Sequence, residues 1–293
     1  MQVIQFPYSC NEFFKDADYL SHDNYIVIND RDEVFWNGSL LKIKGECSFD
    51  FPKVKIIPGN KFLLVDSERS LGKTKNKGNA WIINNYGEIE KTFYLGGVQN
   101  LLVTSTRILA SYSECELDTS RIFHENTPQK SFSSQSLVAF NNSGEILFEY
   151  YRDTKDDDLI FFMENYAFLY KDEESVYFMP YLFSSNPQLP IVELDVNDYS
   201  TQIIFYLSEV EGLLDDLSLP IAFSKKGKDW FFITPDRKKM SHSTVYKISE
   251  TRVVEIVGEC AMSFQSKGLP GGKFLLPTTY EKGKPAKCQL LEL

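Results

Sequence analysis

The chain has 293 residues, of which 43% are hydrophobic, 25% are charged and 14% are aromatic. These fractions are ordinary for a globular protein and exclude an intrinsically disordered chain, and the many Phe and Tyr residues favour strands over helices. The formal net charge of −10 opposes a general role in binding nucleic acid, because contact with a phosphate backbone requires positive charge.

The N-terminal residues 1–14 lack the basic segment and apolar run of a secretory signal. No apolar stretch reaches the roughly 20 residues that a membrane-spanning helix needs. The chain has five cysteines, which are Cys10, Cys47, Cys115, Cys260 and Cys288. Their odd number and irregular spacing favour reduced thiols over a disulfide framework or a zinc site. We therefore expect a cytoplasmic protein with no membrane association.

Apolar and aromatic runs of strand length recur along the chain, with turn residues roughly every eight to twelve positions. Residues 10–20 could form a short helix and residues 208–217 a turn or two, but helical periodicity is weak elsewhere. The predicted strands are residues 24–29, 33–36, 39–44, 54–57, 61–66, 79–84, 88–94, 99–103, 107–113, 136–141, 145–151, 159–163, 166–171, 175–179, 190–195, 202–207, 220–224, 229–233, 243–248, 252–257, 272–277 and 286–292. This pattern predicts an all-β fold.

Two stretches of the chain resemble each other closely. Residues 81–93 read WIINNYGEIEKTF and residues 138–150 read VAFNNSGEILFEY, with a weaker copy, IAFSKKGKDWFFI, at residues 221–233. The residues expected in their turns are Asn84 and Gly87, Asn141 and Gly144, and Gly227. Unrelated hairpins also look alike because turns use few residue types, but the matching apolar runs on both sides favour one hairpin repeated in successive units. The turn glycines are then expected to have positive φ.

A second pair of similar segments covers residues 44–68 and 257–281. Gly-Glu-Cys follows the first residue of each segment, and both continue to Pro-Gly-x-Lys-Phe-Leu-Leu. About four units of 50-odd residues would separate the two segments. Repeats of about 40 to 50 residues that contain several strands are typical of β-propellers. The length fits six four-stranded blades better than seven. Residues 2–6 could supply the missing strand of the last blade and close the ring, so we predict one propeller domain over residues 1–293.

The blade pattern resembles that of the quinoprotein-like and WD40-like propeller superfamilies. In those proteins a third strand is followed by an Asn/Asp-x-x-Gly turn and by a fourth strand with Glu-Ile or Glu-Val. Residues 79–94 and 136–151 match this pattern, and residues 220–233 match it more weakly. The repeated Gly-His and Trp-Asp dipeptides of true WD40 blades and the tryptophan-docking repeats of quinone-binding enzymes are missing. The resemblance implies a propeller that binds partners and implies no cofactor.

Few motifs in the sequence suggest catalysis. Residues 67–74, SERSLGKT, imitate a phosphate-binding loop, but a serine replaces the first glycine and a turn follows where a helix is needed. The acidic clusters at residues 29–33, 153–158 and 215–216 lie in predicted turns, where solvated loops are expected. His22, His124 and His242 are isolated in the sequence. We therefore assign no catalytic, cofactor-binding or metal-binding residue.

Two hypotheses about the function of the chain remain after these motifs are set aside. The first is a non-enzymatic binding or scaffold propeller, expected to be monomeric, that recognises a protein or peptide partner. Its candidate binding segment is the insertion at residues 115–136, which contains Arg121, Phe123 and His124. The alternative is a glycan-acting hydrolase, which requires two or more carboxylates about 5 to 9.5 Å apart in the axial channel, one with a raised pKa. A binding propeller is instead expected to have a narrow or plugged channel and an apolar or aromatic patch on one face.

Overall fold

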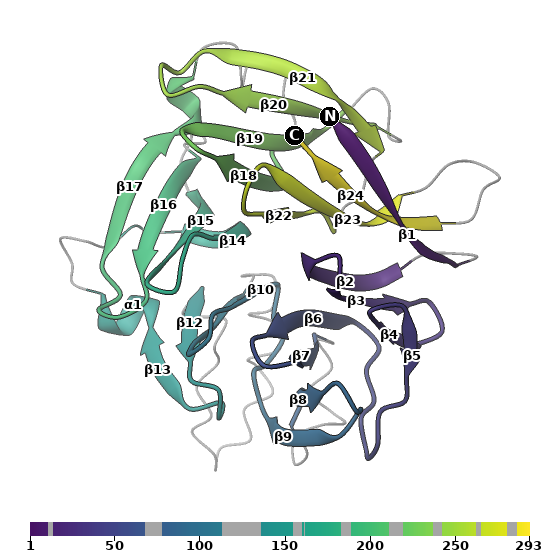
Figure 1. The fold of residues 1–293 in the computed structure, drawn as a ribbon. Helices are drawn as coiled ribbons and strands as arrows, with labels where there is room; N and C mark the ends of the chain where they lie inside the picture. The colour runs from purple at the N-terminus through teal and green to yellow at the C-terminus, as the bar shows by residue number, and fades with distance from the viewer. Residues whose placement is uncertain are drawn as a thin grey trace.

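The computed structural model describes residues 1–10, 14–67, 78–112, 136–154, 160, 162–182, 189–210, 219–236, 242–261, 265–279 and 286–293. They form six four-stranded antiparallel sheets arranged around an axis, so the chain folds as a six-bladed β-propeller (Figure 1). The predicted fold class and the count of six blades are confirmed. Within the described residues, helix is limited to α1 (Tyr150–Asp153) and the 3-10 turn η4 (Leu207–Glu209), and no helix there is long and apolar enough to cross a membrane.

The strands follow one another along the chain, blade by blade. Blade 1 contains β2 (Phe14–Ser21), β3 (Asn24–Asn29), β4 (Val34–Trp36) and β5 (Ser39–Leu41). Blade 2 contains β6 (Pro52–Ile57), β7 (Lys61–Asp66), β8 (Ala80–Asn84) and β9 (Ile89–Phe93). Blade 3 contains β10 (Asn100–Val103), β11 (Ile108–Ser111), β12 (Leu137–Phe140) and β13 (Ile146–Glu149). Blade 4 contains β14 (Phe162–Tyr170), β15 (Ser175–Leu182), β16 (Pro190–Asp195) and β17 (Thr201–Tyr206). Blade 5 contains β18 (Ala222–Lys226), β19 (Asp229–Pro235), β20 (His242–Ile248) and β21 (Val254–Ala261). Blade 6 contains β22 (Lys267–Leu269), β23 (Lys273–Thr279), β24 (Ala286–Glu292) and the N-terminal β1 (Gln2–Cys10).

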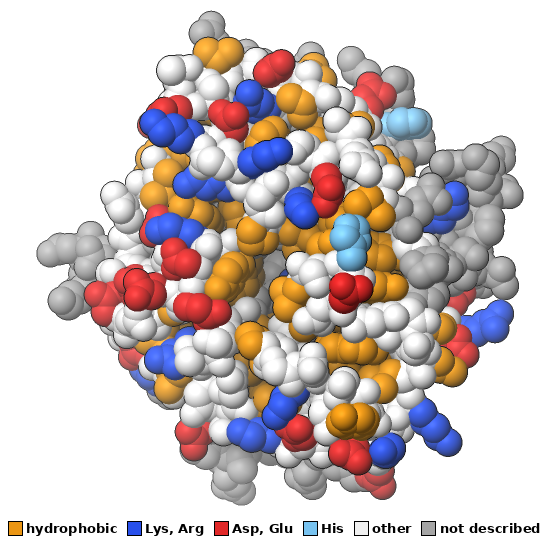
Figure 2. Space-filling model, in the orientation of Figure 1, with side chains coloured by type: hydrophobic (Ala, Val, Ile, Leu, Met, Phe, Trp, Pro, Cys, Tyr) orange, Lys and Arg blue, Asp and Glu red, His pale blue; other side chains and the backbone are white. Residues whose placement is uncertain are grey.

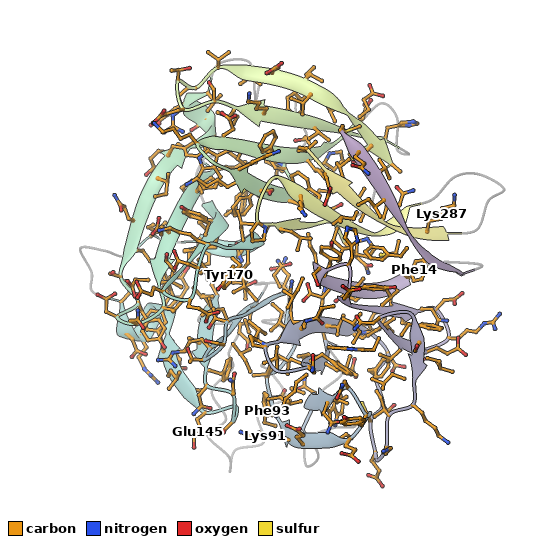
Figure 3. All side chains as sticks on the ribbon, viewed as in Figure 1. Phe14, Lys91, Phe93, Glu145, Tyr170 and Lys287 are labelled. Atoms are coloured by element: carbon orange, nitrogen blue, oxygen red, sulfur yellow. The ribbon has the colours of Figure 1, made fainter. Side chains whose placement is uncertain are left out.

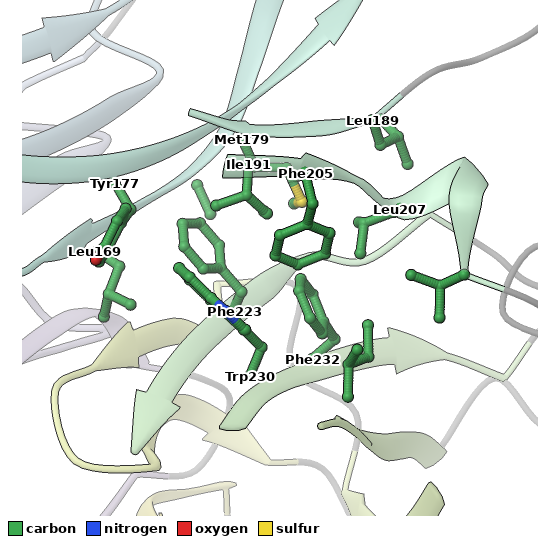
Figure 4. Packing of buried hydrophobic residues seen from close by; sticks show 13 residues of the cluster. Leu169, Tyr177, Met179, Leu189, Ile191, Phe205, Leu207, Phe223, Trp230 and Phe232 are labelled. Atoms are coloured by element: carbon green, nitrogen blue, oxygen red, sulfur yellow. The ribbon is translucent and has the colours of Figure 1, made fainter. Parts of the chain in front are cut away.

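The aromatic side chains fill the spaces between blades. Successive residues of a strand point to opposite faces of the sheet, so Trp230 and Phe232 of β19 pack in a cluster with blade 4 (Figure 4). Phe231 and Ile233 of the same strand pack on the other face, in a cluster with blade 6. Because both faces of a blade are buried, its middle strands have continuous apolar runs rather than alternating ones.

The N-terminal strand closes the ring. Strand β1 pairs with β24 in antiparallel register, from Gln2 opposite Glu292 to Gln5 opposite Gln289, and forms the outer strand of blade 6. Phe6 is buried, and its ring centroid lies 4.8 Å from that of Tyr25 in blade 1. The prediction that residues 2–6 complete the last blade is confirmed.

Deletion of residues 1–6 is expected to lower the free energy of unfolding by about 2 kcal/mol or more, because the buried Phe6 side chain is lost and β24 becomes an open edge. Thermal unfolding of the shortened chain measures the effect. Val3→Ser is the control, since Val3 is in the same strand with 45% of its surface exposed. An unchanged melting temperature for the deletion would contradict closure by β1.

The repeated turns join the third and fourth strands of blades 2 and 3. Asn84 Oδ1 accepts hydrogen bonds from the N–H groups of Tyr86 and Glu88, both at 3.0 Å. Asn141 Oδ1 accepts the equivalent bonds two and four residues further on. Gly87 and Gly144 both have φ of +79°, as predicted, and the turn glycine Gly227 has φ of +61°.

Each of these turns also rests on the outer strand of the preceding blade. A Cβ on Gly87 would lie 2.1 Å from the carbonyl oxygen of Lys42, just beyond β5. A Cβ on Gly144 would lie 2.5 Å from the ring of Phe93 in β9, and Lys91 Nζ of that strand donates to the turn at Asn142 O, 3.1 Å away (Figure 3). The glycines therefore serve the backbone conformation and the contact between blades together.

Gly87→Val and Gly144→Val are each expected to cost well over 1 kcal/mol, since the φ strain alone is about 1 kcal/mol or more and the side chain meets the neighbouring blade. Gly59→Val is a matched control, because Gly59 has φ of +91° and no atom within 4 Å of an added Cβ. Denaturant unfolding should place both variants below this control. Equal losses at all three sites would mean that the turns do not contact the preceding blade.

Three expectations about local structure are wrong. Residues 14–20 are not helical but belong to strand β2, in which the buried Asp16 and Asp18 alternate with Ala17 and Tyr19. The weak third copy of the hairpin, residues 221–233, joins the first and second strands of blade 5, not the third and fourth. Residues 159–163 and 166–171 were expected as two strands, and their described part forms the single strand β14.

Candidate functional site

A cavity of about 320 Å³ lies on the axis of the ring. The first strands of five blades line it, together with residues of the turns that follow them; these strands are β2, β6, β10, β14 and β22. Among the described residues, the first strand of blade 5, β18, contributes none to the lining of the cavity. The first strands of the two blades beside it, β14 and β22, contact each other directly. In Figure 2 the surface is hollowed near the centre of the ring, and Figure 3 places Tyr170, a lining residue, beside that centre. We call this cavity the axial pocket.

The lining residues can be ordered by depth. The first strands of all blades run in the same direction, since each leads to a first turn at the same face of the ring. In each lining segment the late residues lead into exposed first turns and lie at the rim, and the early residues lie at the other end of the pocket, which we call its deep level. The deep level contains Lys53, Asn100 and Ser266, and the rim contains Pro58 and Glu173 together with other turn residues.

Two buried aspartates tie β2 to β6. Asp16 Oδ2 accepts a hydrogen bond from Val54 N at 2.7 Å, and Asp18 Oδ2 accepts one from Ile56 N at 2.8 Å. The inner edge of β6 has no neighbouring strand, so its N–H groups would otherwise lack partners. The two aspartates are two positions apart in β2, and the two N–H groups that they accept are two positions apart in β6. This spacing matches the repeat of two by which side chains of a strand point to the same face. The carboxylates thus replace a missing strand at the axis.

Two lysines neutralise these carboxylates. Lys55 Nζ lies 2.9 Å from Asp18 Oδ1, and Lys267 Nζ lies 2.7 Å from Asp16 Oδ1 and 2.7 Å from Ala17 O. Burial lowers the pKa of Lys267, and the charge of Asp16 opposes this shift. A third lysine, Lys53, also lines the pocket, and its side chain makes no hydrogen bond or ion pair within the described part of the chain.

The rim contains a third carboxylate, which links blades 3 and 4. Glu173 Oε2 accepts hydrogen bonds from the N–H of Ser105, at 2.9 Å, and from its hydroxyl, and Oε1 accepts one from Tyr170 OH at 2.8 Å. The bond from the Ser105 hydroxyl is the main cause that lowers the pKa of Glu173. Burial, and then the bond to Glu173, raises the pKa of Tyr170 to about 12.

Glu173 is expected to contribute to stability at neutral pH and to lose this contribution in acid. Its native pKa lies below the ordinary value of 4.5, so protons bind more tightly to the unfolded chain and stability falls as the pH drops through the native pKa. Glu173→Gln should make the acid decline in melting temperature shallower, and Glu174→Gln is the control at the next position. Parallel pH profiles for Glu173→Gln and the unmodified chain would contradict this role.

The residues proposed from the sequence for partner binding lie outside the described structure. Arg121, Phe123 and His124 fall within residues 113–135, so their role stays a prediction. The acidic cluster at residues 29–33 forms a turn in which Asn29 Oδ1 accepts from Glu33 N at 2.9 Å, as expected of a loop. Most of the other two acidic clusters falls outside the described residues.

Cys47 and Cys260 are free thiols. Burial raises the pKa of Cys47 to about 12, to which the Asp66 charge adds, and burial raises that of Cys260 to about 11. Both thiols are therefore protonated at neutral pH and poorly reactive. The described residues include no group of three or more His, Cys, Asp or Glu side chains that could hold a metal ion.

The axial pocket was not predicted from the sequence, which gave only the expectation that a binding propeller has a narrow or plugged channel. A signal for it exists in the sequence. Residues 16–18 read Asp-x-Asp and residues 53–55 read Lys-x-Lys, each at the spacing of one strand face. The helix expected over residues 10–20 concealed this alternation.

Comparisons with known proteins show the fold alone. A search finds no protein family whose model matches the chain and no curated protein that is similar to it. The solved structure of a subtype N11 neuraminidase-like protein of A/flat-faced bat/Peru/033/2010 (H18N11) is 11% identical to this chain. Its TM-score is 0.54, over 99% of this chain and 90% of that one.

Two further structures resemble the chain less closely. The β-propeller domain of the Trilobed protease from Pyrococcus furiosus is 13% identical, with a TM-score of 0.43 over 94% of this chain and 81% of that one. A putative 6-phosphogluconolactonase from Bacteroides fragilis is 13% identical, with a TM-score of 0.42 over 83% and 69%. None of these similarities identifies a WD40 or quinoprotein superfamily.

Proposed function

We propose that the chain is a non-enzymatic binding propeller that accepts a peptide segment of a partner protein in its axial pocket. The observation that carries this proposal is the pocket itself, which is preformed on the ring axis and is lined by strands from five blades. Its volume of about 320 Å³ lies at the small end of the usual range for ligand sites, ~300–1,000 Å³. Such a pocket suits one chain segment rather than a large folded surface.

The chemistry of the carboxylates argues against the glycan-hydrolase alternative. A glycosidase needs one carboxylic acid with a raised pKa and a second carboxylate free to act on the sugar or on water. Asp16 and Asp18 each accept a backbone N–H and face a lysine, so both are committed to joining strands. Glu173 has a lowered pKa, which is the opposite of what a general acid requires.

The rim of the pocket offers apolar contact surface. Leu20, at the end of β2, has 55% of its surface exposed, and Pro58 and Pro270 lie in the turns beside the pocket. Tyr170 also lines the pocket, with its hydroxyl held by Glu173. Apolar and aromatic groups around a cavity are the usual anchors of peptide recognition.

The proposal is tested with a random octapeptide library and a variant that fills the pocket. Val103, in the β10 part of the lining, is replaced by Trp, and Leu40→Trp on the outer strand of blade 1 is the control. We expect selected peptides to bind the unmodified chain and Leu40→Trp equally and to bind Val103→Trp at least tenfold more weakly. Circular dichroism checks that both variants fold.

Two results would overturn the proposal. If no peptide is selected, or if peptides bind Val103→Trp as well as the unmodified chain, the pocket is not a peptide site. If a panel of fluorogenic glycosides is hydrolysed and Asp18→Asn removes this activity, the enzyme alternative replaces it. Replacement of residues 117–133 by a short Gly/Ser linker tests separately whether the segment with Arg121, Phe123 and His124 contributes to binding.

A further inference from the structure

Charge is distributed unevenly along the depth of the axial pocket. Lys53 lies at the deep end, Lys55 lies two residues nearer the rim on the same strand, and Glu173 lies at the rim on blade 4. The pocket is therefore positive at its base and negative at its mouth. From this arrangement we propose that the axial pocket binds the free C-terminal carboxylate of a peptide with apolar final residues, and that Lys53 is the residue that pairs with it. This inference rests on the proposed peptide-binding function.

The lysines of the pocket leave one positive charge without compensation. Lys55 pairs with Asp18, and Lys267 pairs with Asp16, so two cations and two carboxylates balance. Lys53 has no such partner among the residues that the structure describes, although it is only partly exposed. A partly desolvated ammonium without a counter-ion is unfavourable. A ligand with a single negative charge at this depth supplies the missing partner.

The environment of Lys53 selects a carboxylate with an apolar chain. Asn100 and Ser266 add polar groups at the same deep level of the pocket. Toward the rim the wall is mainly apolar, with Leu101, Val103 and Leu20 among its residues. The ligand is thus expected to place its charged end at the base and its apolar part above it.

The mouth of the pocket opposes ligands with further negative charge. Glu173 is held there as a carboxylate by Ser105 and Tyr170, so a polyanion would be repelled where it enters. An N-terminal ammonium would meet the uncompensated charge of Lys53, which makes the reverse orientation of a peptide unfavourable. The C-terminus of a peptide meets both requirements. It has a single negative charge, which can reach the base, and it has N–H groups that can face the acidic rim.

The ion pair at Lys267 lies in the wall of the pocket, next to its deep level. Lys267 lines the pocket, whereas its partner Asp16 does not, so the carboxylate lies behind the lysine. Lys267 Nζ also donates to Ala17 O at 2.7 Å and thereby joins blade 6 to blade 1 at the axis. A ligand that enters from the rim therefore meets at this level a lysine whose charge is already compensated, and Lys53 is left to pair with its carboxylate.

The test uses two random octapeptide libraries of the same sequences, one with free C-terminal carboxylates and one with C-terminal amides. We expect the unmodified chain to prefer the free acids at least tenfold. Lys53→Met should lose this preference and Lys53→Arg should keep it. Lys44→Met is the matched control, because Lys44 lies on the surface, where it pairs with Glu88. Melting temperatures confirm that each variant is folded.

The outcomes separate this inference from the proposed function. No binding of either library overturns the peptide-binding function, and with it this inference. Equal binding of acids and amides overturns the carboxylate inference and leaves peptide binding in place. A preference for free acids that survives Lys53→Met overturns the assignment to Lys53.

Hexanoate serves as a small monocarboxylate probe. Displacement of a bound free-acid peptide by hexanoate that depends on Lys53 supports the inference. Hexanoate binding without any peptide binding would show that a small carboxylate, not a peptide, is the ligand.

Discussion

Replacement of Gly268 by alanine is expected to lower the free energy of unfolding by about 4 kcal/mol or more, which is exceptional for a single substitution. Gly268 lies in β22, where an added Cβ would stand 1.5 Å from the carbonyl oxygen of Phe223 in β18. Both groups belong to the backbones of inner strands, so the clash cannot be relieved by a side-chain rotation. Strand β22 must move away from β18, which breaks the contact between blades 5 and 6. Urea unfolding followed by circular dichroism measures the loss.

Gly258→Ala is the control for this experiment. Gly258 lies in the outer strand β21, and an added Cβ there would meet only the end of the flexible Met1 side chain, with Sδ at 2.9 Å. Alanine is otherwise favoured over glycine in an extended strand by about 0.5–1 kcal/mol, so little change or a small gain is expected. If Gly268→Ala unfolds at the same urea concentration as Gly258→Ala, the close approach of β22 and β18 is wrong.

The parts of the fold that the sequence predicted correctly are those fixed by local interactions. The turns at residues 84–88 and 141–145 need only an asparagine that accepts two nearby N–H groups and a glycine with positive φ. Pro58-Gly59 and Pro270-Gly271 likewise mark first turns, in blades 2 and 6, as the second pair of similar segments suggested. Such signals depend on a few adjacent residues, so they can be read from one sequence.

The assignment of strands to blades was less successful, because it depends on contacts between distant segments. The strand at residues 201–206 pairs with β16 and completes blade 4, and this pairing alone assigns it to that blade rather than to the next. The hairpin at residues 221–233 uses turn residues like those of the third turns, yet it lies at the start of its blade. Turn chemistry determines where a hairpin occurs but does not determine its place in the ring.

The axial pocket could not be located from the sequence, because its charged residues come from four blades. The pairs Lys55–Asp18 and Lys267–Asp16 form only when the ring is closed. Each of these residues is unremarkable in its own segment: the aspartates were placed in a helix, and the lysines resembled surface residues of a strand and a turn. Their importance comes from the unpaired inner edges of the blades, which a propeller produces at its axis.

The strongest of these contacts at the axis is the ion pair between Lys267 and Asp16. The Asp16 side chain is 2% exposed, and its Oδ1 lies 2.7 Å from Lys267 Nζ. The same carboxylate accepts the Val54 N–H, so it holds the inner edges of blades 1, 2 and 6 together. Removal of one partner from a buried ion pair leaves an uncompensated charge, which costs far more than loss of the attraction between surface charges.

Lys267→Met is therefore expected to destabilise the protein by about 3–5 kcal/mol. The double variant Asp16→Asn with Lys267→Met should recover much of this loss, since it removes the unpaired charge while the asparagine oxygen can still accept the Val54 N–H.

Lys61→Met is the matched control. Lys61 Nζ lies 2.6 Å from Glu90, but both side chains are more than 30% exposed. An exposed ion pair of this kind contributes about 1 kcal/mol or less. Urea unfolding of the four proteins, including the unmodified chain, measures the differences. Similar losses for Lys267→Met and Lys61→Met would mean that solvent reaches the axis freely and that the Asp16–Lys267 pair does not join the blades.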